Sequence, residues 1–274
     1  MAPMILIALA IMALVWLFSK PARRRRRHER TGDQPFPTSW RQILRRGMPY
    51  YRRLPFYLQR QLQQRIQVFV SEKNYIGCNG LEVTEEMRVL IAAQAGLLLL
   101  NRQTACYPTL SDILIYPDTF LVERDEVDAA NVVHRVKRPL SGESWANSQV
   151  VLSWQDVVEG ASDSTNTNNV VIHEFAHQLD QESGYGNGAP AFADANQASR
   201  WSAVFNDEFN HLREQLARHG TSLLDPYGAQ DPAEFFAVAT ETFFANPVRL
   251  QAERPLLYEE LARFYCVSPI MWVD

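Results

Sequence analysis

The sequence predicts an α+β fold: a small mixed sheet and a set of helices, with one transmembrane helix ahead of them. Short β-like runs separated by turn residues fill residues 113–154, and segments with helical periodicity lie on both sides of them. A continuous apolar stretch stands at the N-terminus. We therefore expect an anchor at 1–19, a basic and polar linker at 20–39, and one globular domain at 40–274.

The apolar N-terminal stretch has the features of a single-span anchor. Residues 2–18 are continuously apolar, which at about 1.5 Å per residue is just long enough to span the hydrocarbon core of a bilayer. Lys20 and the run from Arg23 to Arg27 follow at once, and no basic side chain precedes the stretch. The positive-inside rule then places the basic side, and everything after it, in the cytoplasm.

The charge of the chain is unevenly distributed. Residues 20–30 hold seven of the 27 Lys and Arg side chains and a single acidic residue, Glu29, so residues 31–274 carry a net charge of about −10. An acidic body argues against nucleic acid as a partner. Cys78, Cys106 and Cys266 are few and widely spaced, which predicts reduced structural thiols and excludes a disulfide framework.

Helical segments come before and after the β-like runs. Apolar residues recur at spacings of three and four from Trp40 to Phe69, where Pro49 and Pro55 divide the segment. A helix that begins at Thr84 is apolar nearly all round, so we place it in the core. Further helices are expected at 170–180, 200–218, 232–245 and 256–265.

The helix expected at 170–180 carries an HExxH motif, in which His173 and His177 lie four residues apart. On a helix that spacing puts both imidazoles on one face, where their neutral nitrogens reach one zinc ion at about 2.0–2.1 Å. Glu174 follows the first histidine and is a candidate general base for a water molecule. Apolar neighbours and an asparagine at the helix start favour a metal site over two histidines in an ordinary buried helix.

A catalytic zinc site needs a third protein ligand. A glycine and a third histidine after HExxH are excluded, because Asp180 and Ser183 occupy those positions. The remaining candidates are carboxylates, and Glu234 and Glu241 lie near one face of an otherwise apolar helix. We favour Glu234 as the ligand and Glu241 as the group that orients a histidine. Asp225 stays open as a third candidate, and a helix-capping role is the alternative for Glu234.

Two further features concern the substrate side of such a site. Tyr227 lies in the loop before Glu234, where its hydroxyl can hydrogen-bond a tetrahedral oxyanion; packing under the loop is the alternative. In many zinc peptidases the edge strand before the metal helix binds extended substrate. Here that strand is Gln149–Trp154, and an ordinary core strand is the alternative.

The sequence resembles the Mlc titration factor A (MtfA) family of bacterial zinc-dependent peptidases. The resemblance rests on Asn169–Asp180 (NVVIHEFAHQLD), on Asp231–Val238 (DPAEFFAV), and on Tyr227 upstream of the second stretch. The order of elements agrees over roughly residues 40–270. The resemblance implies a zincin-like metallopeptidase fold related to that of anthrax lethal factor. It also implies Zn²⁺ held by His173, His177 and Glu234, with Glu174 as the base and Tyr227 at the oxyanion.

The same resemblance implies peptidase activity of an aminopeptidase-like kind and, in enterobacterial members, the glucose repressor Mlc as a partner. The anchor and the arginine run depart from those members. We expect a zinc metallopeptidase of the bacterial inner membrane that faces the cytoplasm and cleaves peptide or protein substrates, or a cytosolic one if the anchor is not used. The alternatives are a regulatory protein that sequesters a transcriptional repressor and a zinc hydrolase that is not a peptidase. Glu174 favours hydrolysis, because a binding role needs no base.

Overall fold

The computed structural model describes residues 30–118, 120–127, 133–140, 142–145, 148–192 and 194–272, with side chains only outside 119–147. The predicted anchor at 1–19 and the first half of the linker lie outside these residues. No helix within the described part of the chain combines the length and the apolar character that a bilayer crossing requires.

The N-terminal half of the domain begins with a layer of helices. The helices α3 (Thr38–Gly47), α4 (Tyr50–Arg53) and α5 (Phe56–Glu72) are separated by the two prolines that the sequence analysis singled out. The next helix, α6 (Glu85–Leu97), begins after Thr84, whose hydroxyl accepts a hydrogen bond from the Met87 backbone N–H. Most of α6 is buried, which confirms the expectation that it lies in the core.

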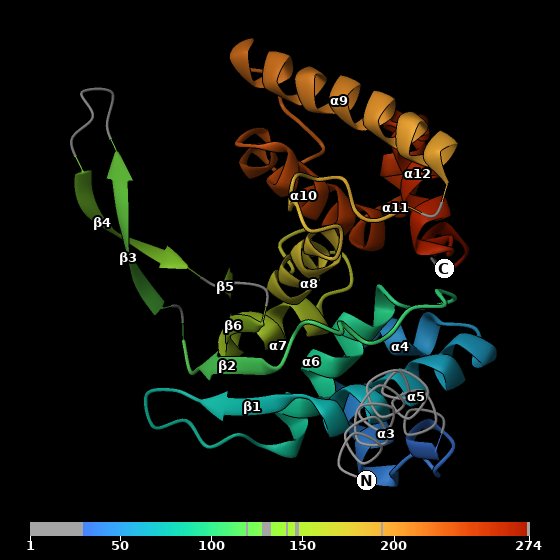
Figure 1. Ribbon diagram of the computed structural model, residues 1–274. Coiled ribbons are helices and arrows are strands. Elements are labelled where there is room, and N and C mark those ends of the chain that lie inside the picture. The colour runs from blue at the N-terminus through green and yellow to red at the C-terminus, as the bar shows by residue number, and fades with distance from the viewer. Residues whose placement is uncertain are drawn as a thin grey trace, which may run out of the picture.

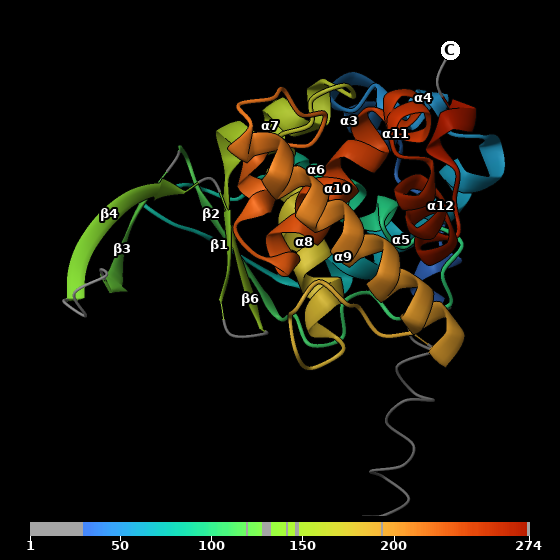
Figure 2. The same cartoon turned by 90° about the horizontal axis from the view of Figure 1, so that it is seen from above.

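The sheet has four strands in the order β1 (Asn74–Gly77), β2 (Asp112–Tyr116), β6 (Gln149–Ser153) and β5 (Gly142–Trp145). The first three strands are parallel, and β5 is antiparallel to β6. The strands β3 (Phe120–Val127) and β4 (Val133–Leu140) form a separate antiparallel ribbon that projects from the rest of the domain (Figures 1 and 2). The predicted β-like runs are confirmed, whereas β1 and β5 were not predicted.

The expectation that Gln149–Trp154 forms the edge strand is wrong. β6 is hydrogen-bonded to β2 on one side and to β5 on the other, so it is an interior strand. Its continuous apolar run, Val150 to Leu152, is typical of a strand buried on both faces. The edge next to α8 (Val170–Gln181), the helix that carries the histidine pair, belongs to β5, which contacts this helix.

The C-terminal half is helical. Its elements are α7 (Trp154–Ser162), α8 (Val170–Gln181), α9 (Ala195–Ala217), the 3₁₀ turn η1 (Pro226–Ala229), α10 (Pro232–Ala245), α11 (Pro247–Glu253), α12 (Pro255–Tyr265) and the 3₁₀ turn η2 (Pro269–Trp272). α8 and α10 pack side by side, and α9 crosses over α10 on the side away from the sheet (Figures 1 and 2). α9 begins five residues earlier than expected, because Asp194 caps it.

An aromatic cluster holds α9 on α10. The ring of Trp201 stacks on Phe205 at a centroid distance of 3.7 Å and meets the edge of Phe236 at 5.6 Å. Phe205 also meets the edge of Phe235, and all four side chains are buried. Burying side chains of this size contributes several kcal/mol in total. The helix that carries Glu234 is therefore fixed in position by its apolar face.

Candidate metal centre and active site

The start of α8 is fixed by Asn169. Its side-chain oxygen accepts a hydrogen bond from the Ile172 backbone N–H at 3.0 Å, while its amide nitrogen donates to Gln94 Oε1 and to the Gly160 carbonyl. The N-cap thus ties α8 to α6 and to α7. One turn further on, the rings of His173 and His177 lie on one face of the helix, with centroids 4.8 Å apart.

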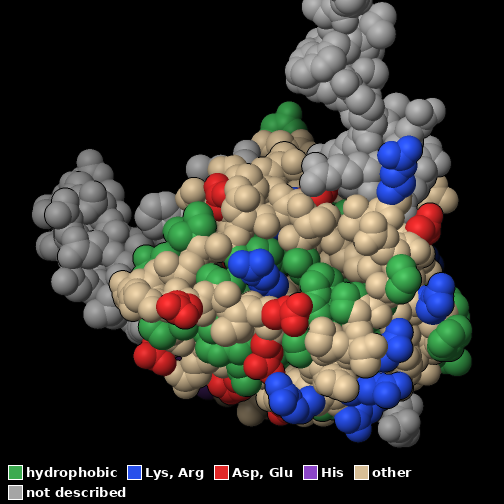
Figure 3. Space-filling model, turned by 90° about the horizontal axis from the view of Figure 1, so that it is seen from below, with side chains coloured by type: hydrophobic (Ala, Val, Ile, Leu, Met, Phe, Trp, Pro, Cys, Tyr) green, Lys and Arg blue, Asp and Glu red, His purple; other side chains and the backbone are tan. Residues whose placement is uncertain are grey.

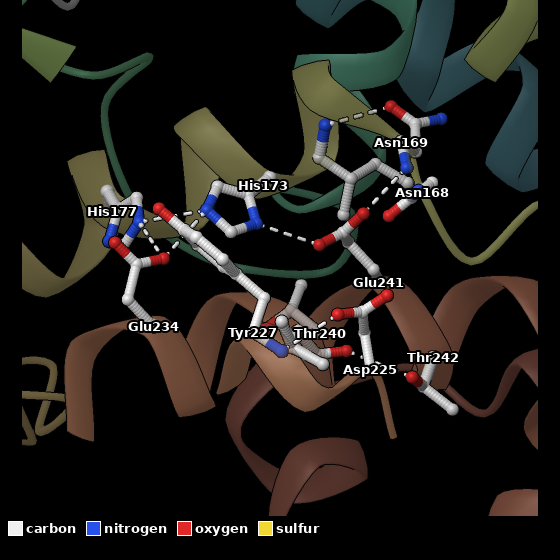
Figure 4. A network of polar contacts seen from close by, with 12 residues as sticks. Asn168, Asn169, His173, His177, Asp225, Tyr227, Glu234, Thr240, Glu241 and Thr242 are labelled. Atoms are coloured by element: carbon white, nitrogen blue, oxygen red, sulfur yellow. Dashed lines mark hydrogen bonds and ion pairs between the residues drawn. The ribbon is translucent and has the colours of Figure 1, made fainter. Parts of the chain in front are cut away.

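The start of α10 is fixed by a similar cap. Asp231 Oδ1 accepts hydrogen bonds from the backbone N–H groups of Ala233 and Glu234 at 2.9 and 3.0 Å, and Pro232 stands at the first helical position. The Glu234 carboxylate contacts the histidines and not the Asp231 backbone. Figure 4 shows that side chain pointing toward the two histidines of α8 instead.

Three side chains converge between the two helices. Glu234 Oε2 lies 3.0 Å from His173 Nε2 and 3.4 Å from His177 Nε2, and the two histidine nitrogens are 3.1 Å apart. Tetrahedral zinc with bonds of about 2.0–2.1 Å holds its ligand atoms roughly 3.3 Å from one another. The donor set and its spacing therefore fit a zinc ion, and the cluster is the one group of potential ligands of this kind among the described residues.

Glu241 approaches the same histidine from its other nitrogen. Its Oε1 lies 2.7 Å from His173 Nδ1, and its Oε2 accepts a hydrogen bond from the Asn169 backbone N–H at 2.6 Å. The side chain is only 4 % exposed. A carboxylate in this position keeps a proton on Nδ1, so Nε2 is the ring nitrogen that faces Glu234 and His177 (Figure 4).

The electrostatics of the cluster follow from burial and hydrogen bonding. Burial of the His173 ring opposes its protonation, but the hydrogen bonds with Glu234 and Glu241 outweigh it and raise the pKa of His173 well above its ordinary value. Burial likewise favours the neutral acid at Glu234, yet hydrogen bonds with both histidines lower the pKa of Glu234 to about 2. The ionised Glu234 carboxylate therefore attracts positive charge at the point where the two histidines converge, as a metal site requires.

An open cavity of about 260 Å³ lies against this cluster. Glu174, Tyr227 and Asp225 line it together with His173. The Tyr227 ring is 6.0 Å from the His173 ring, and Figure 4 shows its hydroxyl end directed toward the histidines. Asp225 Oδ1 accepts a hydrogen bond from the Tyr227 backbone N–H at 2.8 Å, which holds the turn that aims the tyrosine.

The structure narrows several alternatives from the sequence. Asp225 lies outside the three-ligand cluster, and Glu234 does not act as a capping glutamate. Asp180, which stands where the excluded pattern has a glycine, is fully buried and accepts a hydrogen bond from the Gly188 backbone N–H at 2.7 Å, so it is not a surface residue. His211 and His219 are exposed, away from the metal cluster.

Two residues of the cavity wall were not predicted from the sequence. Asp156 and Glu159 line the cavity from α7. Ser153 is the N-cap of α7, and its Oγ accepts a hydrogen bond from the Asp156 backbone N–H at 3.3 Å. The serine is a short-range cap signal in the sequence, but α7 follows β6 without a turn, and no helix was predicted there.

A family model described as glucose-regulated metallo-peptidase M90 matches residues 22–266. The chain belongs to this family. The match covers all the residues of the histidine–glutamate cluster and confirms the predicted membership of the MtfA group of metallopeptidases.

Two relatives illustrate the range of the M90 family. The chain is 37 % identical over 266 residues to the uncharacterized protein slr2042 of Synechocystis, with 97 % of this chain and 96 % of that protein covered. It is 31 % identical over 204 residues to Mlc titration factor A of Yersinia pestis, with 73 % of this chain and 74 % of that protein covered. This M90 chain therefore combines helices and a small sheet with a His–His–Glu cluster, a donor set that suits zinc.

Proposed function

We propose that the protein is a zinc-dependent peptidase. The observation that carries the proposal is the convergence of His173, His177 and Glu234 beside an open cavity lined by Glu174. His173 and His177 would hold the ion through Nε2, and Glu234 through Oε2. Bound zinc supplies Lewis acidity, which polarises a carbonyl oxygen and lowers the pKa of water.

The remaining steps fall to side chains of the chain itself. The Glu174 carboxylate accepts the proton of the attacking water and passes it to the leaving amine. The Tyr227 hydroxyl donates a hydrogen bond to the oxyanion that develops at the scissile carbonyl. Glu241 holds the His173 ring in the orientation and tautomer that metal binding requires.

Extended substrate would bind along β5 rather than β6. Among the described strands β5 pairs with β6 alone, and it lies beside α8, so a peptide strand can add to its other edge within reach of the cavity. The cavity wall supports an aminopeptidase-like preference. It includes the carboxylates of Asp156, Glu159 and Asp225, and none of its described lining residues is Lys or Arg. Such a wall attracts the free α-ammonium group of a peptide.

The test compares zinc content and peptide hydrolysis in the full chain and in Glu174→Gln. We expect the variant to retain zinc and lose turnover by several orders of magnitude, because the base is absent while all three ligands remain. Glu214→Gln makes the same chemical change on the exposed face of α9 and should leave turnover unaltered. Undiminished hydrolysis by Glu174→Gln would remove the assignment.

A companion series identifies the third ligand. Zinc content is measured in Glu234→Gln, Glu241→Gln and Asp225→Asn. We expect the largest loss in Glu234→Gln, because Glu234 Oε2 is the carboxylate oxygen within 3.4 Å of both histidine nitrogens. Loss of zinc confined to the Asp225 variant would contradict this choice.

A second candidate role is regulatory binding. It is favoured by the 31 % identity to a protein named Mlc titration factor A, whose name describes titration of Mlc. A transcriptional regulator would then be bound, or cleaved, by a protein held at the bacterial inner membrane by residues 1–19 with its domain in the cytoplasm. The test expresses Glu174→Gln and measures repressor binding together with transcription of a gene that the repressor controls. If the repressor still binds and transcription responds as with the wild type, sequestration is the function. If the repressor binds but the transcriptional response is lost, cleavage is the function.

A further inference from the structure

We infer that the α3–α5 layer is a docking surface for an anionic phospholipid bilayer. The surface, called here the basic face, consists of Arg41, Arg45, Arg52, Phe56, Tyr57 and Arg60. The inference concerns how the domain sits on a membrane. It uses the proposed anchor only as supporting context and does not depend on peptidase activity.

The charge of this layer is opposite to that of the rest of the domain. Residues 34–71 contain seven arginines and no acidic residue. Residues 72–274 contain 13 of the 27 basic and 29 of the 31 acidic side chains, a net charge of −16. An anionic surface therefore repels most of the molecule and attracts this layer.

The arginines of the basic face form a continuous band. The Arg52 guanidinium donates a hydrogen bond to the Arg45 carbonyl, which joins α4 to α3. Arg41 and Arg45 are four residues apart on α3 and share one side of it. Arg41 also lines a cavity of about 430 Å³ together with Arg60 of α5, and Asp33 is the one acidic residue in that wall. Arg46 is left out of the basic face, because it pairs with Glu86 at 2.9 Å.

Large apolar side chains extend from the same band. Phe56 is 76 % exposed and Tyr57 is 62 % exposed, at the first turn of α5. Phe56 lies four residues before Arg60, on the same side of the helix. Arginine beside exposed aromatic rings is typical of contact with the bilayer interface, where headgroup phosphates and the acyl boundary meet. Figure 3 shows Lys and Arg side chains gathered toward one side of the lower face, the side on which α3, α4 and α5 lie in Figure 1.

The chain enters the domain at this face. Gly32 packs against Gln64 of α5, and residues 32–34 line the cavity that Arg41 and Arg60 share. The residues that precede this point are the apolar stretch 2–18 and the arginine run 23–27. Fewer than 15 residues separate the apolar stretch from Gly32, which is at most roughly 50 Å of extended chain, so a bilayer that holds the stretch lies within reach of the basic face. The occupant that charge and chain position favour is therefore the lipid surface itself.

The test measures backbone hydrogen exchange in the full chain mixed with vesicles of phosphatidylcholine alone or of phosphatidylcholine with phosphatidylglycerol. The first amides of α5, at Phe56 and Tyr57, have no partner within the helix and exchange readily until a surface covers them. We expect slower exchange across residues 45–60 on the anionic vesicles only, with no change across α9. The effect should largely disappear in 1 M salt, where the screening length is about 3 Å.

Matched variants separate docking from general charge. Arg45→Glu with Arg52→Glu should lower the ratio of docked to undocked protein by at least roughly fivefold per arginine, so about 25-fold for the pair. Arg213→Glu with Arg218→Glu makes the same change of charge on α9 and should leave docking intact, with the melting temperature of each variant as the check on folding. Phe56→Ser with Tyr57→Ser is a second variant that should weaken docking without any change of charge.

Three results would overturn the inference. Equal slowing on neutral and anionic vesicles would mean that the anchor alone brings the domain to the bilayer. No slowing on either would mean that the basic face stays in solvent. Slowing by added tRNA but not by vesicles would assign the face to nucleic acid.

Discussion

The contact between Glu241 and His173 gives the most informative single substitution, Glu241→Gln. In the wild type the two carboxylate oxygens accept two hydrogen bonds, from His173 Nδ1 at 2.7 Å and from the Asn169 backbone N–H at 2.6 Å. A glutamine has one acceptor oxygen. Whichever donor that oxygen serves, the NH₂ group faces the other donor, so one buried donor loses its partner.

The size of the effect follows from this count. Leaving a buried donor unsatisfied costs about 1–3 kcal/mol, which appears as lower stability of the metal-free protein. If the lost bond is the one to His173, the ring is no longer held with Nε2 toward the metal. Loss of such an orienting carboxylate typically lowers metal affinity about 10–100-fold. Glu234→Gln removes the proposed third ligand and should lower zinc affinity further.

Two measurements check this. Competition with a chromophoric chelator gives the zinc affinity, and urea denaturation of the metal-free protein gives the free energy of unfolding. Glu253→Gln is the matched control, because Glu253 is an exposed residue paired with Arg249 on α11; it should change unfolding by less than about 0.5 kcal/mol. Unchanged zinc affinity together with lower stability would refute the orienting role and leave Glu241 as a structural link between α8 and α10.

Three further substitutions test other contacts. Tyr227→Phe should retain zinc and lower kcat about 10²–10³-fold with little change in KM, as steady-state kinetics would show. Burial raises the pKa of Asp180, although the hydrogen bond from the Gly188 N–H opposes the shift, so the contribution of this carboxyl to stability is present at acidic pH and is lost as pH rises through the folded pKa. Asp180→Asn should therefore gain stability relative to the wild type as pH rises above about 4, the ordinary pKa of an aspartate, as denaturation of the metal-free protein would show. Gly188 has φ +76° and an added Cβ would lie 2.2 Å from the Pro232 carbonyl oxygen, so Gly188→Ala should destabilise well beyond the roughly 1–3 kcal/mol that its backbone conformation costs. Gly184→Ala, at φ +90° with nothing within 4 Å, gives that backbone cost alone.

The features that the sequence predicted well depend on short-range signals. His173 and His177 lie four residues apart, so helix geometry alone puts them on one face. Asp231 followed by Pro232 is a local helix start, and it sets the turn from which Glu234 projects. Glu234 and Glu241 were paired by their spacing of two turns. Each of these inferences needs only the helix repeat and the chemistry of the residues.

The features that the sequence did not predict depend on pairing between distant segments. β5 has four residues, Gly142–Trp145, and is a strand only because β6 lies beside it. The order β1–β2–β6–β5 decides which strand forms the edge, and no residue within β6 encodes that order. Asp156 enters the cavity wall because α7 packs against α8, a contact between helices that the sequence pattern does not reveal.

The imidazole of His173 links the metal site to the packing of the two helices. Glu234 and Glu241 are two turns apart, about 10.5 Å along α10, and His173 reaches from α8 into the space between them. Its Nε2 meets one carboxylate at 3.0 Å and its Nδ1 meets the other at 2.7 Å. Both contacts form only at one separation and one register of the helices. Any change that shifts α10 along α8 therefore disturbs the contacts of Glu234 and Glu241 with His173 together. For this reason zinc affinity should be a sensitive measure of the packing of the aromatic cluster between α9 and α10.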